Sequence, residues 1–308
     1  METILAMAVG PQKDVIIDST AKLADARPYV AGLVKALKRK LGTDYKIDYR
    51  ERELHQLAPG SEAAKAFKSA EPNKLVFAMS STVVLAAESL SPPPPIIWPS
   101  VSDWMLDKIK KENSTGVSAR RTQSAGDCLL RFMATVPTLE TVHVLHNPGY
   151  PPSDRALALV QRVANTRNVS VRVLSVQSAS EIKAKLATLR SRDTREPAFE
   201  GVLPLPIDVC FGAAKMIIHE AQENKKIPVF LATTDLVRHE LPSALGGFGV
   251  SQHRCGELAA DFVDQVVFAN RKPAELPMKQ VAIGDFEWIV SAAAANDLNI
   301  PIVQMKTI

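Results

Sequence analysis

Short runs of apolar residues alternate with helical patterns along almost the whole chain. In its first third, apolar runs predict strands at 4–9, 45–49, 75–79 and 96–98. Between them, apolar residues three and four positions apart predict a helix at 28–41 and a second helix at 82–90. This alternation favours a parallel sheet with helices on its faces.

The same rhythm starts again after about residue 140. We expect strands at 142–145, 169–176, 202–205 and 228–232. Helices are expected at 153–164, capped by Ser153, at 178–189, capped by Ser178, and at 209–223. Two separate strand–helix series predict an α/β fold with two doubly wound parallel-sheet lobes.

The pattern changes after Ala244, where Gly246, Gly247 and Gly249 surround apolar residues. A helix is expected at 254–268, and a strand with a short helix at 286–297. These elements are too few for a third lobe, so the chain must cross back between the first two. We therefore predict an N-terminal lobe of 1–117 plus 252–283 and a C-terminal lobe of 118–251 plus 284–308, joined by a three-stranded hinge.

Composition narrows the class of protein. Hydrophobic residues make up 46% of the 308 residues, charged residues make up 23%, and the net charge is +4, which is typical of a globular protein. The densest basic cluster, Lys35 to Lys40, is best interpreted as the solvated end of a helix, and we expect no nucleic-acid partner.

No stretch is long and apolar enough to span a membrane. The first residues lack a signal-peptide pattern, which leaves open a cytoplasmic protein or one whose export signal is absent from this sequence.

Cysteine, histidine and serine patterns give no sign of catalysis. Cys128, Cys210 and Cys255 lie far apart in apolar surroundings, which predicts buried free thiols and no metal site. None of the six histidines has the spacing of a metal site or a catalytic triad, and no phosphate-binding glycine motif or nucleophile elbow is present. We expect no enzyme activity, no cofactor and no metal.

Polar residues follow the expected strands, at the sheet edge where open α/β folds bind ligands. In the first series these residues are Ser80, Ser81, Thr82, Ser102 and Asp103. Hydroxyls and free backbone N–H groups at a helix start suit an anionic ligand. The alternative is that they only cap helices.

The second series shows the same feature. Here the candidate ligand-binding residues are Asn147, Asp208, Thr234 and Asp235. For Asn147 the alternative is a purely local role in holding its turn. Taken together, both series predict capture of a small polar ligand by hydrogen bonds in the cleft between the lobes.

Several segments, in order along the chain, resemble the substrate-binding proteins of ABC transporters related to tryptophan- and tyrosine-binding importers. The main ones are KLVFAMSSTVVLAA, STGVSARR, VHVLHNPGYPPS, GVSQHRCGELAADFVDQVVFANRKPAELPM and FEWIVSAAAANDLNIP. Gln252 and His253 stand where that family has paired tyrosines, so the class of ligand stays open.

The resemblance implies the type I periplasmic-binding fold and a monomer that delivers a small anionic or zwitterionic solute, amino-acid-like or an aromatic acid, to an ABC permease and its ATPase subunit. It also implies a periplasmic or membrane-associated extracytoplasmic location. One alternative is a cytoplasmic ligand-sensing or regulatory protein of the same fold, and another is an enzyme on this scaffold.

Overall fold

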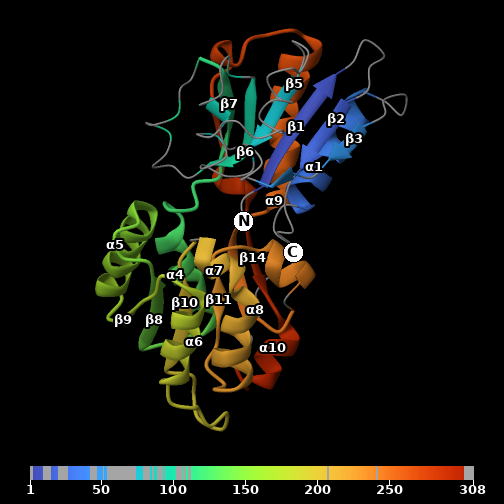
Figure 1. Cartoon of the computed structure of the whole chain (residues 1–308). Coiled ribbons are helices and arrows are strands. Elements are labelled where there is room, and N and C mark those ends of the chain that lie inside the picture. The colour runs from blue at the N-terminus through green and yellow to red at the C-terminus, as the bar shows by residue number, and fades with distance from the viewer. Residues whose placement is uncertain are drawn as a thin grey trace. The chain divides into compact units, whose positions relative to one another are not determined.

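A computed structural model shows two compact α/β units (Figure 1). It describes residues 3–9, 15–19, 27–41, 47–50, 52–53, 74–78, 84, 87–88, 93, 95–101, 106, 109, 112–206, 208–240 and 242–301. Unit 1 comprises Met1–Ala119 and Gln252–Ala282, and unit 2 comprises Arg120–Ser251 and Ile283–Ile308. The chain therefore passes from one unit to the other three times.

Unit 1 is built on one mixed sheet. Its strands are β1 (Thr3–Val9), β2 (Val15–Ser19), β3 (Ile47–Arg50), β4 (Arg52–Glu53), β5 (Lys74–Ala78), β6 (Ile96–Val101), β7 (Ser114–Ser118) and β13 (Lys279–Gln280). The order is β13-β7-β6-β5-β1-β2-β3, with β4 pairing β1. From β13 to β5 all neighbouring strands are parallel. The edge strand β13 belongs to the segment Gln252–Ala282, in which the chain returns to unit 1.

The amino-terminal strand differs from the all-parallel sheet that the sequence pattern predicts. β1 runs antiparallel to both β2 and β5. Residues 10–14 separate β1 from β2, and a connection that short joins antiparallel neighbours, because a parallel pair needs a crossover of a dozen residues or more. The expected strands at 45–49, 75–79 and 96–98 are present within two or three residues at each end.

Two helices of unit 1 pack at backbone contact. α1 (Arg27–Leu41) lies against α9 (Gln252–Val263), which continues as a π-helix, Asp264–Phe268. A Cβ placed on Gly32 would lie 1.9 Å from the carbonyl oxygen of His253, and one on Gly256 would lie 2.0 Å from that of Tyr29. The two glycines therefore let the helices approach more closely than any side chain would allow.

Unit 2 is a nearly all-parallel sheet covered on both faces. Its strands are β8 (Thr141–His146), β9 (Ser170–Ser175), β10 (Glu200–Pro204), β11 (Phe230–Leu231), β12 (Gly246–Val250) and β14 (Phe286–Val290). A parallel bridge between Val202 and Val229 joins the group β9-β8-β10 to the group β11-β12-β14, and among these described strands only β14 is antiparallel to its neighbour. This is the doubly wound arrangement that the strand–helix alternation predicts.

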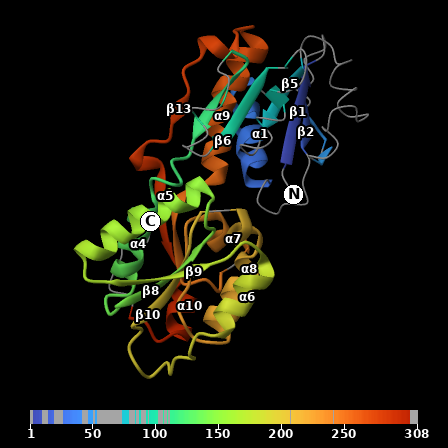
Figure 2. The same cartoon turned by 60° about the vertical axis from the view of Figure 1, so that its left-hand side comes forward.

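Helices α4 (Ala125–Thr135) and α5 (Pro151–Thr166) cover one face of this sheet. The other face is covered by α6 (Ala179–Ala187), α7 (Asp208–Gly212) and α8 (Ala214–Ile217) (Figure 2). The short helix α10 (Ala292–Asp297) follows β14. Between helices and sheet, Phe132 stacks on Phe230 with ring centroids 5.1 Å apart in the buried core.

One helix start is as predicted and another is not. Ser178 caps α6, and its side chain accepts a hydrogen bond from the Glu181 backbone N–H. α5, in contrast, begins at Pro151, two residues before the predicted cap Ser153. Proline needs no hydrogen-bond partner for a backbone N–H and is favoured in the first helical turn. Ser153 instead accepts a hydrogen bond from the Asn147 backbone N–H at 2.9 Å.

The helix predicted at 209–223 is broken into α7, α8 and a π-helix, Ile218–Glu223. The π-helix carries Gln222, whose side-chain oxygen accepts hydrogen bonds from the backbone N–H groups of Val229 and Leu245, each at 3.0 Å. Its side-chain nitrogen donates to the carbonyl oxygen of Ser243. One buried side chain therefore ties together the segments that lead into β11 and β12.

Candidate ligand-binding site

The carboxyl ends of five parallel strands of unit 2 meet at one edge of the sheet, which we call the carboxyl edge of unit 2. These strands are β8 to β12, and the antiparallel β14 begins at the same edge. The amino-terminal turn of α4 also lies here, because the Cys128 thiol donates to the carbonyl oxygen of Leu231, the last residue of β11. Open α/β sheets bind ligands at this edge.

A tight turn positions Asn147 directly after β8. Pro148 and Gly149 form its centre, Gly149 has φ +77°, and the Tyr150 backbone N–H donates to the Asn147 carbonyl oxygen at 3.3 Å. Proline followed by a left-handed glycine defines a type II turn. The Asn147 side chain is half-buried, and none of the described residues forms a hydrogen bond with its amide. The turn thus holds Asn147 at the carboxyl edge with its amide available to a ligand.

The polar residues after β11 are buried and already have partners. Thr234 donates its hydroxyl to Glu287 at 3.1 Å, and the same carboxylate pairs with Arg238 at 3.2 Å. Asp235 accepts a hydrogen bond from the Ser251 hydroxyl at 3.1 Å. In this structure the two predicted residues therefore hold the ends of β11, β12 and β14 together.

The histidine that ends β8 also supports this edge. His146 is 7% exposed, and its Nε2 lies 2.7 Å from an Asp154 carboxylate oxygen on α5. This contact holds the start of α5 beside the turn that carries Asn147. The sequence pattern predicts no role for His146, because its partner becomes a neighbour only when α5 folds back.

An arginine at the carboxyl edge was also missed. The Arg121 guanidinium carbon lies 5.1 Å from the centroid of the Phe211 ring, which belongs to α7. A cation over an aromatic ring at this distance is a favourable contact. The sequence offered no signal for this pair, because 90 residues separate its members.

The other predicted residues are not placed. Ser80, Ser81, Thr82, Ser102 and Asp103 lie outside the described residues. Asp208 opens α7, but its side chain also lies outside them. Of the predicted set, the structure thus brings together Asn147, Thr234 and Asp235 at one edge, with the backbone of Asp208 following β10.

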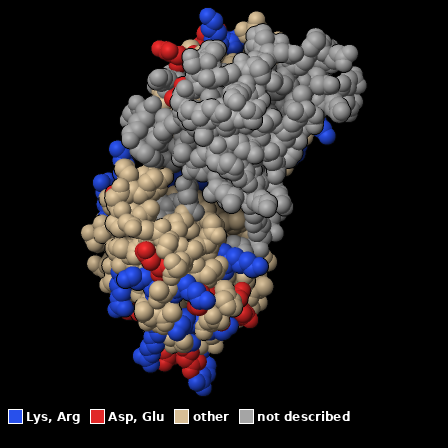
Figure 3. Space-filling view, viewed as in Figure 1, with Lys and Arg blue, Asp and Glu red and all other residues tan. Residues whose placement is uncertain are grey.

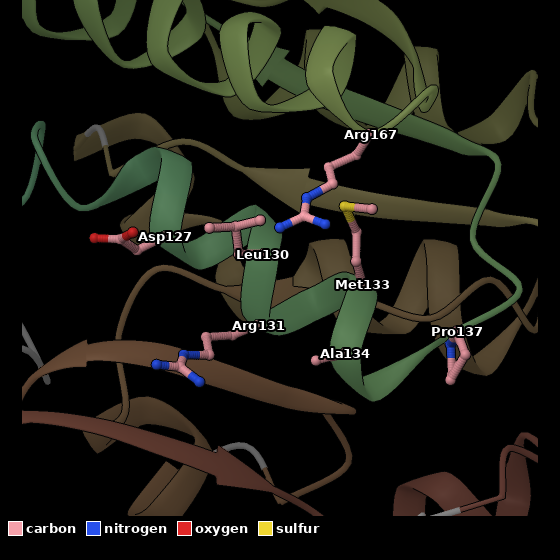
Figure 4. Close-up of a pocket in the computed structure, with 7 residues that line it drawn as sticks. All are labelled: Asp127, Leu130, Arg131, Met133, Ala134, Pro137 and Arg167. Atoms are coloured by element: carbon pink, nitrogen blue, oxygen red, sulfur yellow. The ribbon is translucent and has the colours of Figure 1, made fainter.

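A separate hollow of about 530 Å³ runs along the outer side of α4 (Figure 4). Its lining consists of Asp127, Leu130, Arg131, Met133, Ala134, Pro137 and Arg167. Arg131 turns toward β14, where its guanidinium carbon lies 4.9 Å from the centroid of the Trp288 ring. The hollow has no convergent set of polar groups, and we assign it no ligand.

Surface charge and metal-binding side chains indicate no further site in the described part of the chain. On the face of unit 2 that Figure 3 shows, Lys and Arg are interspersed with Asp and Glu. Within the described ranges, no group of three or more His, Cys, Asp or Glu side chains could hold a metal ion. None of the helices in that part of the chain is long and apolar enough to cross a membrane.

Solved structures share this fold at low sequence identity. A conserved domain protein from Vibrio cholerae matches with a TM-score of 0.70 and 18% identity, over 92% of this chain and 94% of that one. An ABC domain in complex with L-Trp from Streptococcus pneumonia matches with a TM-score of 0.69 and 15% identity, over 92% and 94%. A 5-methylthioribose transporter solute-binding protein from Thermotoga lettingae matches with a TM-score of 0.55 and 12% identity, over 94% and 88%.

A search of curated proteins found no match. A family model described as ABC transporter substrate binding protein matches residues 21–305, which is nearly the whole chain. This match agrees with the resemblance noted in the sequence and with the two-unit α/β fold. The chain belongs to the ABC transporter substrate-binding protein family.

Proposed function

We propose that this protein captures a small anionic or zwitterionic solute and delivers it to an ABC permease, without chemistry of its own. The observation that supports this proposal is the gathering of polar groups at the carboxyl edge of unit 2, in a chain whose family binds transport substrates. Asn147, Asp208, Thr234 and Asp235 follow strands that end there.

The residues of this edge differ in the role we propose for them. Asn147 contacts the solute through its side-chain amide, because a tight turn holds it and its side chain is half-buried. Asp208 is proposed as a second contact, as the sequence predicts. Thr234 and Asp235 have internal partners, so they act by holding the loop after β11 in place. In unit 1, Ser80, Ser81, Thr82, Ser102 and Asp103 remain predicted contacts.

We further propose that the protein works as a monomer outside the cytoplasmic membrane, with a permease and its ATPase as partners. The family assignment supports this location, since its members serve transporters. Fractionation of the native host tests it directly. The alternative is a cytoplasmic ligand-sensing or regulatory protein of the same fold. Two results together favour it: the protein is recovered in the cytoplasmic fraction, and deletion of its gene leaves solute uptake unchanged.

The binding role is tested first by mass spectrometry of the small molecules that co-purify with the protein. Calorimetry with the molecule identified then compares Asn147→Ala with Asn165→Ala, whose exposed side chain lies on α5. Loss of one amide hydrogen bond predicts affinity weaker by about threefold to tenfold for the first variant and unchanged affinity for the second. Equal binding by both variants and the parent contradicts the proposed site. Turnover of the bound molecule contradicts the absence of chemistry.

A further inference from the structure

The loop after β11 lies directly on the backbone of β12, at the carboxyl edge of unit 2. A Cβ on Gly247 would lie 2.3 Å from the carbonyl oxygen of Thr233 in this loop, and one on Gly249 would lie 3.3 Å from the Thr233 Cα. Any side chain at Gly247 would therefore push the loop away from the strand. The two glycines allow this close approach and so determine where the backbone of Thr233 lies.

The two residues that follow Thr233 tie the loop to other elements. The Thr234 hydroxyl donates to the Glu287 carboxylate of β14 at 3.1 Å, and the Ser251 hydroxyl donates to Asp235 at 3.1 Å. Thr234 and Asp235 are both buried. The backbone of Thr233 is thus fixed by contacts at its own position and at the next two residues.

The side chain of Thr233 itself has no such contact. It is 3% exposed, and its hydroxyl oxygen is shielded from water without a hydrogen-bond partner among the described residues. Buried hydroxyl groups almost always have a partner, and leaving one unpaired costs the free energy of removing it from water. Valine has nearly the same shape without the hydroxyl, so stability alone would favour valine at this position. The unpaired hydroxyl therefore points to a partner that this part of the chain does not supply.

The chemistry of the hydroxyl indicates what this partner offers. A hydroxyl carries one O–H donor, and its proton needs an acceptor. Water does not reach the group, so the acceptor belongs to a molecule that packs directly against this loop. Open α/β folds bind their ligands at this edge of the sheet. An anionic or zwitterionic solute brings carboxylate oxygens, and a hydrogen bond to a charged oxygen is stronger than one to a neutral oxygen.

We propose that Thr233 is a solute-binding residue, whose hydroxyl donates a hydrogen bond to a carboxylate oxygen of the bound solute. This inference rests on the proposed function and names one of the groups that recognise the solute. It also moves the contact by one residue from the pair that the sequence predicts, because Thr234 and Asp235 have internal partners and only hold the loop.

Thr233→Val and Thr234→Val make the same chemical change at neighbouring positions of the full chain and should have different effects. Without solute, Thr233→Val should melt at the parent's temperature or above it, whereas Thr234→Val should melt at a lower temperature because Glu287 loses a donor. Calorimetry after dialysis then uses L-tryptophan, phenylacetate and D-arabinose, together with any molecule that mass spectrometry has identified. Thr233→Val should bind the carboxylate that the parent binds roughly tenfold to a hundredfold more weakly.

Two further variants separate recognition from packing. Thr233→Ser keeps the hydroxyl without the methyl group and should retain most of the parent's affinity. If Thr233 acted only through packing, serine would be the poorer substitute and valine the better one. Thr188→Val removes an exposed hydroxyl at the end of α6 and should bind like the parent.

Other results overturn the proposal. It fails if Thr233→Val binds as tightly as the parent, which would mean that an enclosed water or no partner at all serves the hydroxyl. It also fails if Thr233→Val destabilises the solute-free protein as much as Thr234→Val, or if serine does not preserve binding. Weaker binding by Asn147→Ala with normal binding by Thr233→Val, or binding of D-arabinose alone, overturns this inference and leaves a solute-binding function standing. A parent protein that binds no probe and carries no co-purified molecule counts against both.

Discussion

Adding one methyl group to Gly256 should force α1 and α9 apart. A Cβ at this position lies 2.0 Å from the Tyr29 carbonyl oxygen, 2.8 Å from its carbon and 3.0 Å from the Leu33 nitrogen. All three are backbone atoms within α1, so no side chain can rotate away. Restoring ordinary contact of at least 3.4 Å requires the helices to separate by about 1.4 Å.

This separation sets the size of the effect. Overpacking a well-packed core costs about 1–3 kcal/mol, and the upper end applies because rigid backbone must move. Alanine recovers about 1 kcal/mol through its better helix propensity. We expect Gly256→Ala to lower the free energy of unfolding by about 2 kcal/mol, which corresponds to a fall of about 1 M in the urea midpoint.

Urea unfolding followed by circular dichroism measures this change, and hydrogen exchange locates it. Amides in α1 and α9 should lose protection while those of unit 2 keep theirs. Gly212→Ala is the matched control, because a Cβ at Gly212 meets nothing within 4 Å. This control should be as stable as the parent or slightly more stable. If Gly256→Ala unfolds at the same urea concentration as the control, the helices are not packed at backbone contact.

The double variant Gly32→Ala/Gly256→Ala gives an independent check. The Gly32 Cβ would meet the His253 carbonyl oxygen at 1.9 Å, at the same helix crossing. Once one methyl group has separated the helices, the second meets less resistance. The two costs should therefore sum to more than the cost measured for the double variant. Fully additive costs would mean that the two clashes are independent.

Three further predictions concern buried groups of unit 2. Gln222→Leu leaves two backbone N–H groups and one carbonyl oxygen without their partner, so the free energy of unfolding measured in urea should fall by about 3 kcal/mol. The control Gln161→Leu changes an exposed side chain and should leave the free energy of unfolding nearly unchanged. The Arg192 side chain donates to three backbone carbonyls, and burial lowers the pKa of its guanidinium. Arg192→Met removes these hydrogen bonds and should therefore lower the melting temperature at every pH from 5 to 9. An unchanged melting temperature would show that these hydrogen bonds do not stabilise the fold. Burial raises the pKa of the Cys128 thiol well above 9.0 and that of the Cys210 thiol to about 12. Neither thiol should react with a thiol reagent at pH 8 until urea unfolds the protein. The contribution of these two thiols to the free energy of unfolding is present below pH 9 and is lost as the pH rises toward their pKa values in the folded protein.

Several elements could be predicted from local pattern because local interactions determine them. The centres of strands β8 and β10 are buried and mostly apolar, and α6 begins at a serine that caps it through a residue three positions away. The turn at Asn147 follows from proline and glycine next to each other. The family could likewise be inferred, because its motifs are short segments whose order along the chain is visible in the sequence.

The start of α5, the break in the helix around Gln222 and the antiparallel pairing of β1 were not predicted. In the first two cases a distant or competing interaction decides the outcome, whereas β1 pairs antiparallel with β2 because only five residues connect them. Ser153 is a good helix cap, but it bonds Asn147 while prolines occupy the first turn. The π-helix places Gln222 against backbone groups up to 23 residues away.

For the candidate site, too, some features follow from the local sequence and others only from tertiary contacts. By itself the sequence determined which polar residues follow the strands of unit 2, because strand order and turn chemistry are local properties. Only the tertiary structure decided what those residues do. It buries Thr234 against Glu287 and Asp235 against Ser251, and it brings Arg121 over Phe211. These contacts join residues 16 to 90 positions apart, and such pairs meet only after the sheet and its covering helices have packed.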